Sequence, residues 1–255
     1  MSGPEARSSS LFDAAAAEYD AARPSYPDEL YAELEARVGP LAGRLVLDCG
    51  AGTGIASRQL AARGARVVSL DLGEQMLRRA LARSPGSACV QADGNRLPVR
   101  PDRADLVSFA QSWHWLDQEH APAEMARVLR PGGWWAAWWN QATPGEPWWD
   151  TYQSALAASC PSYFEQHLSP DWSHGSISAG GLLTPGGSAA VRWSRQVNIA
   201  DWITDDRSKS YVIELAPAAR EDLLVRLAAI IGQRFPDGQM LVPYTTRLWL
   251  ARKPG

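Results

Sequence analysis

The chain has 255 residues, enough for one large α/β domain with an insertion, and its 45% hydrophobic and 21% charged residues are ordinary for a globular protein. A net charge of −3 gives no indication of a nucleic-acid or anionic-membrane partner. No apolar run reaches membrane-spanning length, and the three scattered cysteines lack metal-ligand spacing, so we expect reduced thiols in a cytoplasmic protein.

Two helices are expected before the first strand. Residues 1–10 are small and polar and are expected to be disordered, whereas residues 11–22 are alanine-rich and residues 28–38 carry apolar side chains at helical spacing. We expect residues 11–40 to form a helical lid. On this lid Tyr19 and Arg23 either contact a cofactor or simply pack at the surface.

The most informative stretch is an apolar run that contains Asp48 and leads into Gly50, Gly52 and Gly54. It predicts a strand, a tight turn and a helix beginning at Ile55. Glycine permits backbone angles closed to other residues, and the N–H groups at a helix start favour a polar or anionic group. The dinucleotide fingerprint G-x-G-x-x-G has a longer spacing, which disfavours a nicotinamide-dependent oxidoreductase.

A second strand, at 65–71, ends at Asp71, about 20 residues beyond the glycine turn. At this offset an acid meets ribose hydroxyls in adenosine-binding sheets. The alternative is that Asp71 caps the helix expected at 73–83, where Met76 lies on the inner face. A third strand, at 88–91, then runs into a turn at Asp93-Gly94.

A fourth strand is expected at 104–109, a helix at 119–129 and a fifth strand at 134–140. Sheets of this kind place ligands at the carboxyl ends of their strands, and here the fourth strand leads into Gln111 and His114. His114 either acts on an acceptor substrate, as general base or hydrogen-bond donor, or makes a structural hydrogen bond.

Prolines and glycines break residues 141–190 into short pieces, which predicts a cap inserted over the site, with one helix at 148–159. Strand pattern resumes at 190–197, a helix is expected at 218–235 and a last strand at 242–251. The chain has 12 tryptophans. Alternation assigns Trp134 and Trp138 to the core, and the cap aromatics either join a core or line an apolar acceptor pocket.

Four motifs resemble those of class I S-adenosylmethionine-dependent methyltransferases: Asp-x-Gly-x-Gly-x-Gly at 48–54, Leu-Pro at 97–98, Asp-x-x-Asp-Leu-Val at 102–107 and Arg-Val-Leu-Arg-Pro-Gly-Gly at 127–133. The run Tyr-Asp-x-x-Arg-Pro-x-Tyr-Pro at 19–27 is similar to small-molecule enzymes of the trans-aconitate methyltransferase type. The resemblance implies an α/β fold with a Rossmann-like, seven-stranded, mostly parallel sheet, an antiparallel last strand, an N-terminal helical lid and an inserted cap. A single domain then spans residues 11–255.

The resemblance also implies S-adenosyl-L-methionine as cofactor and assigns roles to particular residues. Asp93 would approach the adenine amino group and His114 the acceptor. The cofactor would be bound by Tyr19, Arg23, Asp48, Gly50, Ala51, Gly52, Thr53, Asp71, Leu72, Met76, Ala92, Asp93, Gly94, Ala110 and Gln111. The substrate would meet Trp113, Trp115, Trp139, Trp148 and Tyr152, and no metal is expected.

These inferences predict methyl transfer to the oxygen, nitrogen or carbon of a small, apolar or aromatic acceptor, without a metal, by a monomer or homodimer. The chain lacks the Asp/Asn-Pro-Pro-aromatic motif of nucleic-acid amino-methyltransferases after its fourth strand, which argues against base methylation. One alternative is a protein that keeps the cofactor pocket as a binder or catalyses a non-methylating reaction. A nicotinamide-dependent oxidoreductase is less favoured.

Overall fold

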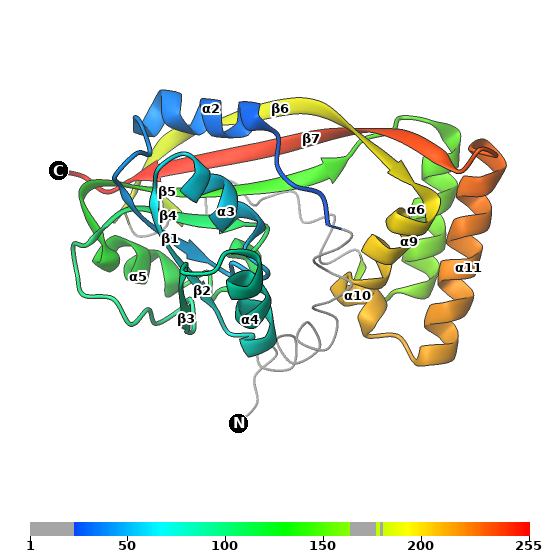
Figure 1. Cartoon of the computed structure of the whole chain (residues 1–255), viewed down its shortest axis with the longest axis horizontal. Coiled ribbons are helices and arrows are strands. Elements are labelled where there is room, and N and C mark those ends of the chain that lie inside the picture. Colours follow the sequence, from blue (N-terminus) through cyan, green and yellow to red (C-terminus); the bar gives the residue numbers. More distant parts are fainter. Residues whose placement is uncertain (1–22, 164–176, 179–180) are drawn as a thin grey trace.

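The computed structural model describes residues 23–163, 177–178 and 181–255, and its strands form one seven-stranded sheet in the order β3-β2-β1-β4-β5-β7-β6 (Figure 1). Neighbours among the first five strands pair in parallel, and β7 pairs antiparallel with both β5 and β6. The expected Rossmann-like sheet with an antiparallel last strand is therefore confirmed. The strands are β1 (Leu45–Cys49), β2 (Arg66–Asp71), β3 (Ala88–Gln91), β4 (Ala104–Ala110), β5 (Leu129–Ala142), β6 (Thr184–Asn198) and β7 (Gln239–Arg252).

Helices cover both faces of this sheet, which explains why its central strands read as continuous apolar runs. On one face α2 (Asp28–Val38) and α3 (Ile55–Ala62) pack against β1, β4, β5 and β7. Leu30 and Leu34 of α2 are fully buried there. The second helix of the expected lid is thus a layer of the core, because its apolar stripe faces the sheet; residues 1–22 lie outside the described residues.

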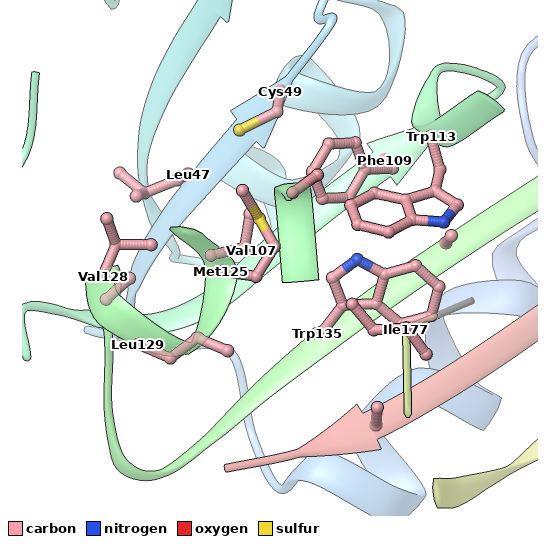
Figure 2. Close-up of a cluster of buried hydrophobic side chains, with 14 of the residues drawn as sticks. Leu47, Cys49, Val107, Phe109, Trp113, Met125, Val128, Leu129, Trp135 and Ile177 are labelled. Carbon is pink, nitrogen blue, oxygen red and sulfur yellow. The ribbon is translucent and has the colours of Figure 1, made fainter. Parts of the chain in front are cut away.

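On the opposite face α5 (Ala121–Val128) and a cluster of aromatic side chains fill the space under β4 and β5. Figure 2 shows the indoles of Trp113 and Trp135 against each other, with Phe109 beside them. Trp113 makes edge-to-face contacts with both, at ring-centroid distances of 4.8 Å to Phe109 and 5.1 Å to Trp135. This geometry is the one aromatic quadrupoles favour, so these rings stabilise the core that supports the strand ends.

A helical subdomain lies at one end of the molecule, where β6 and β7 extend beyond the other strands (Figure 1). It consists of α6 (Pro147–Ser159), α9 (Ile199–Arg207), α10 (Ser210–Ile213) and α11 (Pro217–Arg234), which share one apolar cluster. The cap expected between 141 and 190 therefore supplies α6, while the chain between β6 and β7 supplies the other three helices.

Strand β6 begins at Thr184, earlier than position 190, where the sequence pattern placed its start. The glycines at 186 and 187, which suggested a break, lie within the strand. A Cβ atom on Gly186 would stand 2.5 Å from Cζ3 of Trp134, so a glycine is needed where that indole crosses β6. The pairing of β6 with β7 also shifts register between Pro185 and Gly187, which marks a bulge.

Candidate active site

The turn between β1 and α3 has the conformation that its glycines predict. Gly50, Gly52 and Gly54 have φ angles of 66°, 56° and 79°, in the left-handed region that side chains disfavour. The turn is closed by a hydrogen bond from the backbone N–H of Gly54 to the carbonyl of Ala51, at 2.9 Å, and the Ala51 N–H donates to Leu70 at 3.0 Å. The loop is therefore held against the end of β2.

Gly50 has a second requirement, which comes from Ser112 just beyond β4. A Cβ atom at position 50 would stand 2.4 Å from the Cβ of Ser112. The Ser112 hydroxyl donates to the carbonyl of Cys49 at 2.6 Å, so the end of β4 closes directly on the glycine turn. Sequence reasoning missed this serine, because a single serine after a strand carries no distinguishing pattern.

The carboxylate of Asp71 ties the glycine turn to the next helix, α4 (Glu74–Arg83). Its Oδ2 accepts from the backbone N–H of Gly52 at 2.7 Å, and its Oδ1 accepts from the N–H of Gly73 at 2.8 Å. The second bond closes a local turn just before the helix, and because the N-cap residue of α4 is Gly73, Asp71 is not itself the N-cap. Each carboxylate oxygen has two lone pairs, so these two bonds do not by themselves exhaust its capacity for a vicinal diol.

The residues around Asp71 form an edge open to solvent. Leu72 leaves 38% of its surface exposed, an unusual position for a leucine beside a buried strand. Asp93 is exposed as well, and its Oδ1 accepts from the Asn95 N–H at 2.8 Å, so the expected turn is formed. Met76, a residue of α4, is buried on the inner face of that helix.

Asp48, expected at the cofactor, lies beneath the glycine turn with no exposed surface. Its Oδ2 accepts from the Ser57 hydroxyl at 2.5 Å and its Oδ1 from the Ser108 hydroxyl at 2.8 Å. Burial raises its pKa to about 6, although both serine bonds favour the charged form. The side chain thus joins β1, α3 and β4, and its contact with a cofactor stays a prediction.

Gln111 follows β4 at the point where the order of strands reverses, between β1 and β4, which is where open α/β sheets place ligands. It has a φ of 58°, a strained value for a residue with a side chain. Its backbone N–H donates to the Trp138 carbonyl at 2.9 Å, and its side-chain amide donates to the Tyr26 hydroxyl at 3.5 Å. This strained position therefore connects the end of β4 with the segment before α2.

His114 lies in a short 3-10 turn, Trp113–Trp115, after β4. The indole N–H of Trp139 donates to Nδ1 of His114 at 3.4 Å, and the ring of Trp115 lies 4.7 Å away, centroid to centroid. Desolvation among these rings lowers the pKa of His114 to about 4. The imidazole is therefore neutral at pH 7.

Four of the five aromatic residues expected at the substrate, Trp113, Trp139, Trp148 and Tyr152, are buried in hydrophobic clusters. Trp113 is 1% exposed in the cluster under the sheet, while Trp148 and Tyr152 are buried in the helical subdomain. The Tyr152 hydroxyl accepts from the buried indole N–H of Trp202 at 2.8 Å, which satisfies that donor. Trp115 is half-buried beside His114.

Arg23, expected either at the cofactor or at the surface, lies against the helical subdomain. Its guanidinium forms an ion pair with Asp205 of α9, with Nε and Oδ1 3.3 Å apart. Lys209 joins the same buried group, since its Nζ lies 2.5 Å from Oδ1 of Asp206 and 3.7 Å from Oδ2 of Asp205. Arg23 thus contacts the helical subdomain, while Tyr19 lies outside the described residues.

Two further features of the described residues are the grouping of possible metal ligands and the apolar character of the helices. Within the ranges that the structure describes, no three His, Cys, Asp or Glu side chains are grouped so that they could hold a metal ion. Among the helices of those ranges, none combines the length and the apolar character that a membrane crossing demands.

Comparison with known proteins gives one family match, to the family described as "Methyltransferase domain", over residues 47–137. An uncharacterized methyltransferase of Mycobacterium tuberculosis (strain ATCC 25618 / H37Rv) is 40% identical over 129 residues, which are 51% of each chain. A candidate type II methyltransferase from Anaeromyxobacter dehalogenans shares the fold at a TM-score of 0.63 and 24% identity, covering 91% of this chain and 99% of that one.

The phosphoethanolamine N-methyltransferase 2 of Haemonchus contortus, solved in complex with S-adenosyl-L-methionine, shares the fold at a TM-score of 0.55 and 18% identity. That comparison covers 95% of this chain and 57% of the other. The matched segment, 47–137, contains the glycine turn, Asp71, Asp93 and His114.

Residues 47–137 thus match the methyltransferase domain family, in agreement with the class I S-adenosylmethionine-dependent methyltransferase motifs found in this part of the sequence. The chain spans about half the length of the curated relatives it matches. The trans-aconitate type stays a prediction.

Proposed function

We propose that the protein transfers a methyl group from S-adenosylmethionine to a small-molecule acceptor. The observation that carries this proposal is the anchored carboxylate of Asp71. It lies at the carboxyl edge of a parallel sheet, holds the glycine turn through Gly52, and lies inside the segment that matches the methyltransferase family. The complex of the fold relative from Haemonchus contortus with S-adenosyl-L-methionine supports the same cofactor.

The residues at this edge suit an adenosyl group. Asp71 would accept hydrogen bonds from the two ribose hydroxyls, since carboxylates suit a vicinal diol. The exposed side chain of Leu72 would cover one face of the adenine, and Asp93 with the adjoining backbone would meet its edge. The turn of Gly50, Ala51 and Gly52 would accommodate the remainder of the ligand, because it brings backbone close to the site without Cβ atoms at its glycines.

Bound S-adenosylmethionine supplies an electrophilic methyl group on a sulfonium, so no protein nucleophile is required. The chain has to align the acceptor and exclude water, and alignment of this kind contributes as much as about 7–11 kcal/mol. Gln111 and His114 lie at the end of β4, where the acceptor would be placed. We propose that the reaction needs no metal; activity that survives a chelator supports this, and activity lost and then restored by magnesium contradicts it.

The acceptor is proposed to be a small molecule with an apolar or aromatic part. The half-buried ring of Trp115 and the ring of Trp139, which also contacts His114, support this class. Trp139, Trp148 and Tyr152 are all buried, whereas Trp115 is half-buried, so Trp115 is the most accessible of these four aromatic residues. A base or nucleic-acid acceptor has no support in the charge of the chain.

The test is calorimetric titration with S-adenosylmethionine, S-adenosylhomocysteine and NAD, using wild type, Asp71→Ala and the control Asp222→Asn, an exposed acid on α11. We expect both adenosyl ligands to bind wild type and the control, Asp71→Ala to lose most of the affinity, and NAD not to bind. Binding of NAD alone would identify an oxidoreductase and overturn the proposal.

A second measurement separates an enzyme from a binder. Labelled S-adenosylmethionine is incubated with the protein and a fractionated cell extract, and S-adenosylhomocysteine and labelled products are followed. Transfer of label to a small-molecule fraction supports methyl transfer. Binding without any transfer supports a cofactor-pocket protein with another role.

A further inference from the structure

We propose that Trp139 is a positioning residue that fixes the imidazole of His114 with its proton on Nε2, so that His114 donates a hydrogen bond to the methyl acceptor and does not remove a proton from it. The acceptor in this statement rests on the proposed function. The state of the imidazole itself does not, and it can be measured without any methyl transfer.

The chemistry of the indole and imidazole rings decides which atom donates and which accepts. An indole N–H is a donor with no acceptor capacity, so the Nδ1 atom that it meets at 3.4 Å must present a lone pair. A neutral imidazole carries one N–H, and with Nδ1 accepting, that proton must be on Nε2. The contact therefore selects one of the two tautomers of His114.

The indole is held firmly enough to make this selection. Trp139 belongs to β5, where it pairs with Arg247 of β7, and only 6% of its surface is exposed. Its ring meets Trp249 edge to face, with 5.3 Å between centroids. A side chain enclosed by strand neighbours loses its alternative rotamers, so the direction of its N–H is set by the sheet.

The hydrogen bond from Trp139 to Nδ1 requires a neutral imidazole, and the surroundings of His114 keep the imidazole neutral. Protonation would place a second N–H on Nδ1, facing the N–H of Trp139. Desolvation lowers the pKa of His114 to about 4, so this conflict does not arise at pH 7. The same shift makes the ring a poor general base, because a base works best with a pKa near the operating pH.

A proton on Nε2 of His114 restricts the methyl acceptors that this residue can recognise. A donor at Nε2 recognises a lone pair, such as that of a carbonyl, carboxylate or ether oxygen, or of an unprotonated nitrogen. The acceptor would carry such an atom near the carbon, oxygen or nitrogen that receives the methyl group. His114 would orient it there, and the nucleophile would react without losing a proton to this residue.

The test is a long-range nitrogen–proton NMR correlation of the imidazole rings in uniformly nitrogen-15-labelled protein between pH 5 and 8. The signals of His114 are assigned by their loss in His114→Gln. We expect the pattern of the Nε2–H tautomer, unchanged across this range. Signals of an Nδ1–H tautomer, or a titration near the ordinary pKa of histidine, would overturn the inference.

Two variants separate the hydrogen bond from general packing. Trp139→Phe keeps an aromatic ring but removes the donor, so we expect the two tautomers to mix and the pKa of His114 to rise. Trp115→Phe changes the ring that lies beside His114 and should leave the tautomer as in wild type. Equal spectra for wild type and a folded Trp139→Phe would refute the role of Trp139.

The wild-type spectrum decides the tautomer of His114 even if Trp139→Phe does not fold. Failure of the proposed function would appear in the calorimetric titration with S-adenosylmethionine and would leave the NMR result unchanged. A correct tautomer without cofactor binding would thus retain the positioning role of Trp139 and reject only the methyl acceptor.

Discussion

The Oδ2 atom of Asp71 and the backbone N–H of Gly52 are joined by a 2.7 Å hydrogen bond between the tips of β2 and β1. A charged acceptor makes such a bond stronger than one between neutral groups. Asp71, which the sequence analysis expects to bind a ribose, therefore also holds the glycine turn between β1 and α3 in place. Changes at Asp71 will therefore alter the turn as well as the proposed ligand contact, so effects on the loop alone are best tested at the glycines.

The first prediction concerns Gly50. We expect Gly50→Ala to lower the free energy of unfolding by about 2–4 kcal/mol, because it combines an unfavourable positive φ with a Cβ atom 2.4 Å from the Cβ of Ser112. Chemical denaturation measures this loss. Gly86→Ala is the matched control: its φ is 89°, but nothing lies within 4 Å of the added Cβ, so its loss should be about 1 kcal/mol.

The effect of Gly50→Ala on the free energy of unfolding is also measured in a Ser112→Gly background, which lacks the Cβ atom of Ser112. If the clash with Ser112 is the main cost, Gly50→Ala should be milder in the Ser112→Gly background than in wild type. Equal losses in both backgrounds, or equal losses for Gly50→Ala and Gly86→Ala, would show that contact with the end of β4 does not matter.

The second prediction is a pH dependence caused by Asp48. Its folded pKa of about 6 lies above the unfolded value, so the folded state binds the proton more tightly. Between about pH 4 and pH 6 the folded state thus carries more protons, and stability falls as pH rises through this window and is level above it. The total loss is on the order of 3 kcal/mol.

Asp48→Asn isolates this contribution from the other titrating groups. The amide cannot ionise but can still bond to Ser57 and Ser108, so the difference in stability between wild type and variant should itself change from pH 4 to pH 6. Urea unfolding at several pH values measures this difference. A difference that stays constant over the window contradicts the assignment.

Much of the sheet could be predicted from the sequence because its signals are local. Apolar runs between turn residues located the parallel strands, and the alternating glycines located the turn whose φ angles require them. Asp71 could be singled out because a strand end and a fixed offset from the glycines define it. Each of these patterns lies within about 25 residues of chain.

The remaining features depend on contacts between distant segments. The role of Asp48 is decided by Ser57 and Ser108, and serine has no pattern that marks such a partner. Aromatic residues look alike in a pocket and in a core, so the burial of Tyr152 against Trp202, fifty residues away, could not be inferred. The helical subdomain likewise joins two segments that β6 separates.

The third prediction concerns the ion pair between Arg23 and Asp205. We expect Arg23→Gln to cost about 1–3 kcal/mol of stability, because it leaves the carboxylate of Asp205 largely buried with Lys209 as a more distant partner. The exposed pair of Arg207 and Glu221 is the control, and Arg207→Gln should cost less than about 1 kcal/mol.

A double-mutant cycle with Asp205→Asn measures the coupling directly. A favourable coupling energy between positions 23 and 205 is expected, since the two side chains contact each other. Additive effects of the two substitutions would mean that the pair contributes nothing to holding the segment before α2 against the helical subdomain.

The fourth prediction distinguishes a core role from a substrate role for Tyr152. Tyr152→Phe removes the acceptor of the buried Trp202 indole N–H, and an unsatisfied buried donor costs about 1–3 kcal/mol. Thermal or denaturant unfolding should show this loss, while calorimetric affinity for S-adenosylmethionine stays as in wild type. In the Trp202→Phe background the donor is already gone, so Tyr152→Phe should then cost less. Unchanged stability together with an altered choice of acceptor would instead return Tyr152 to the substrate site.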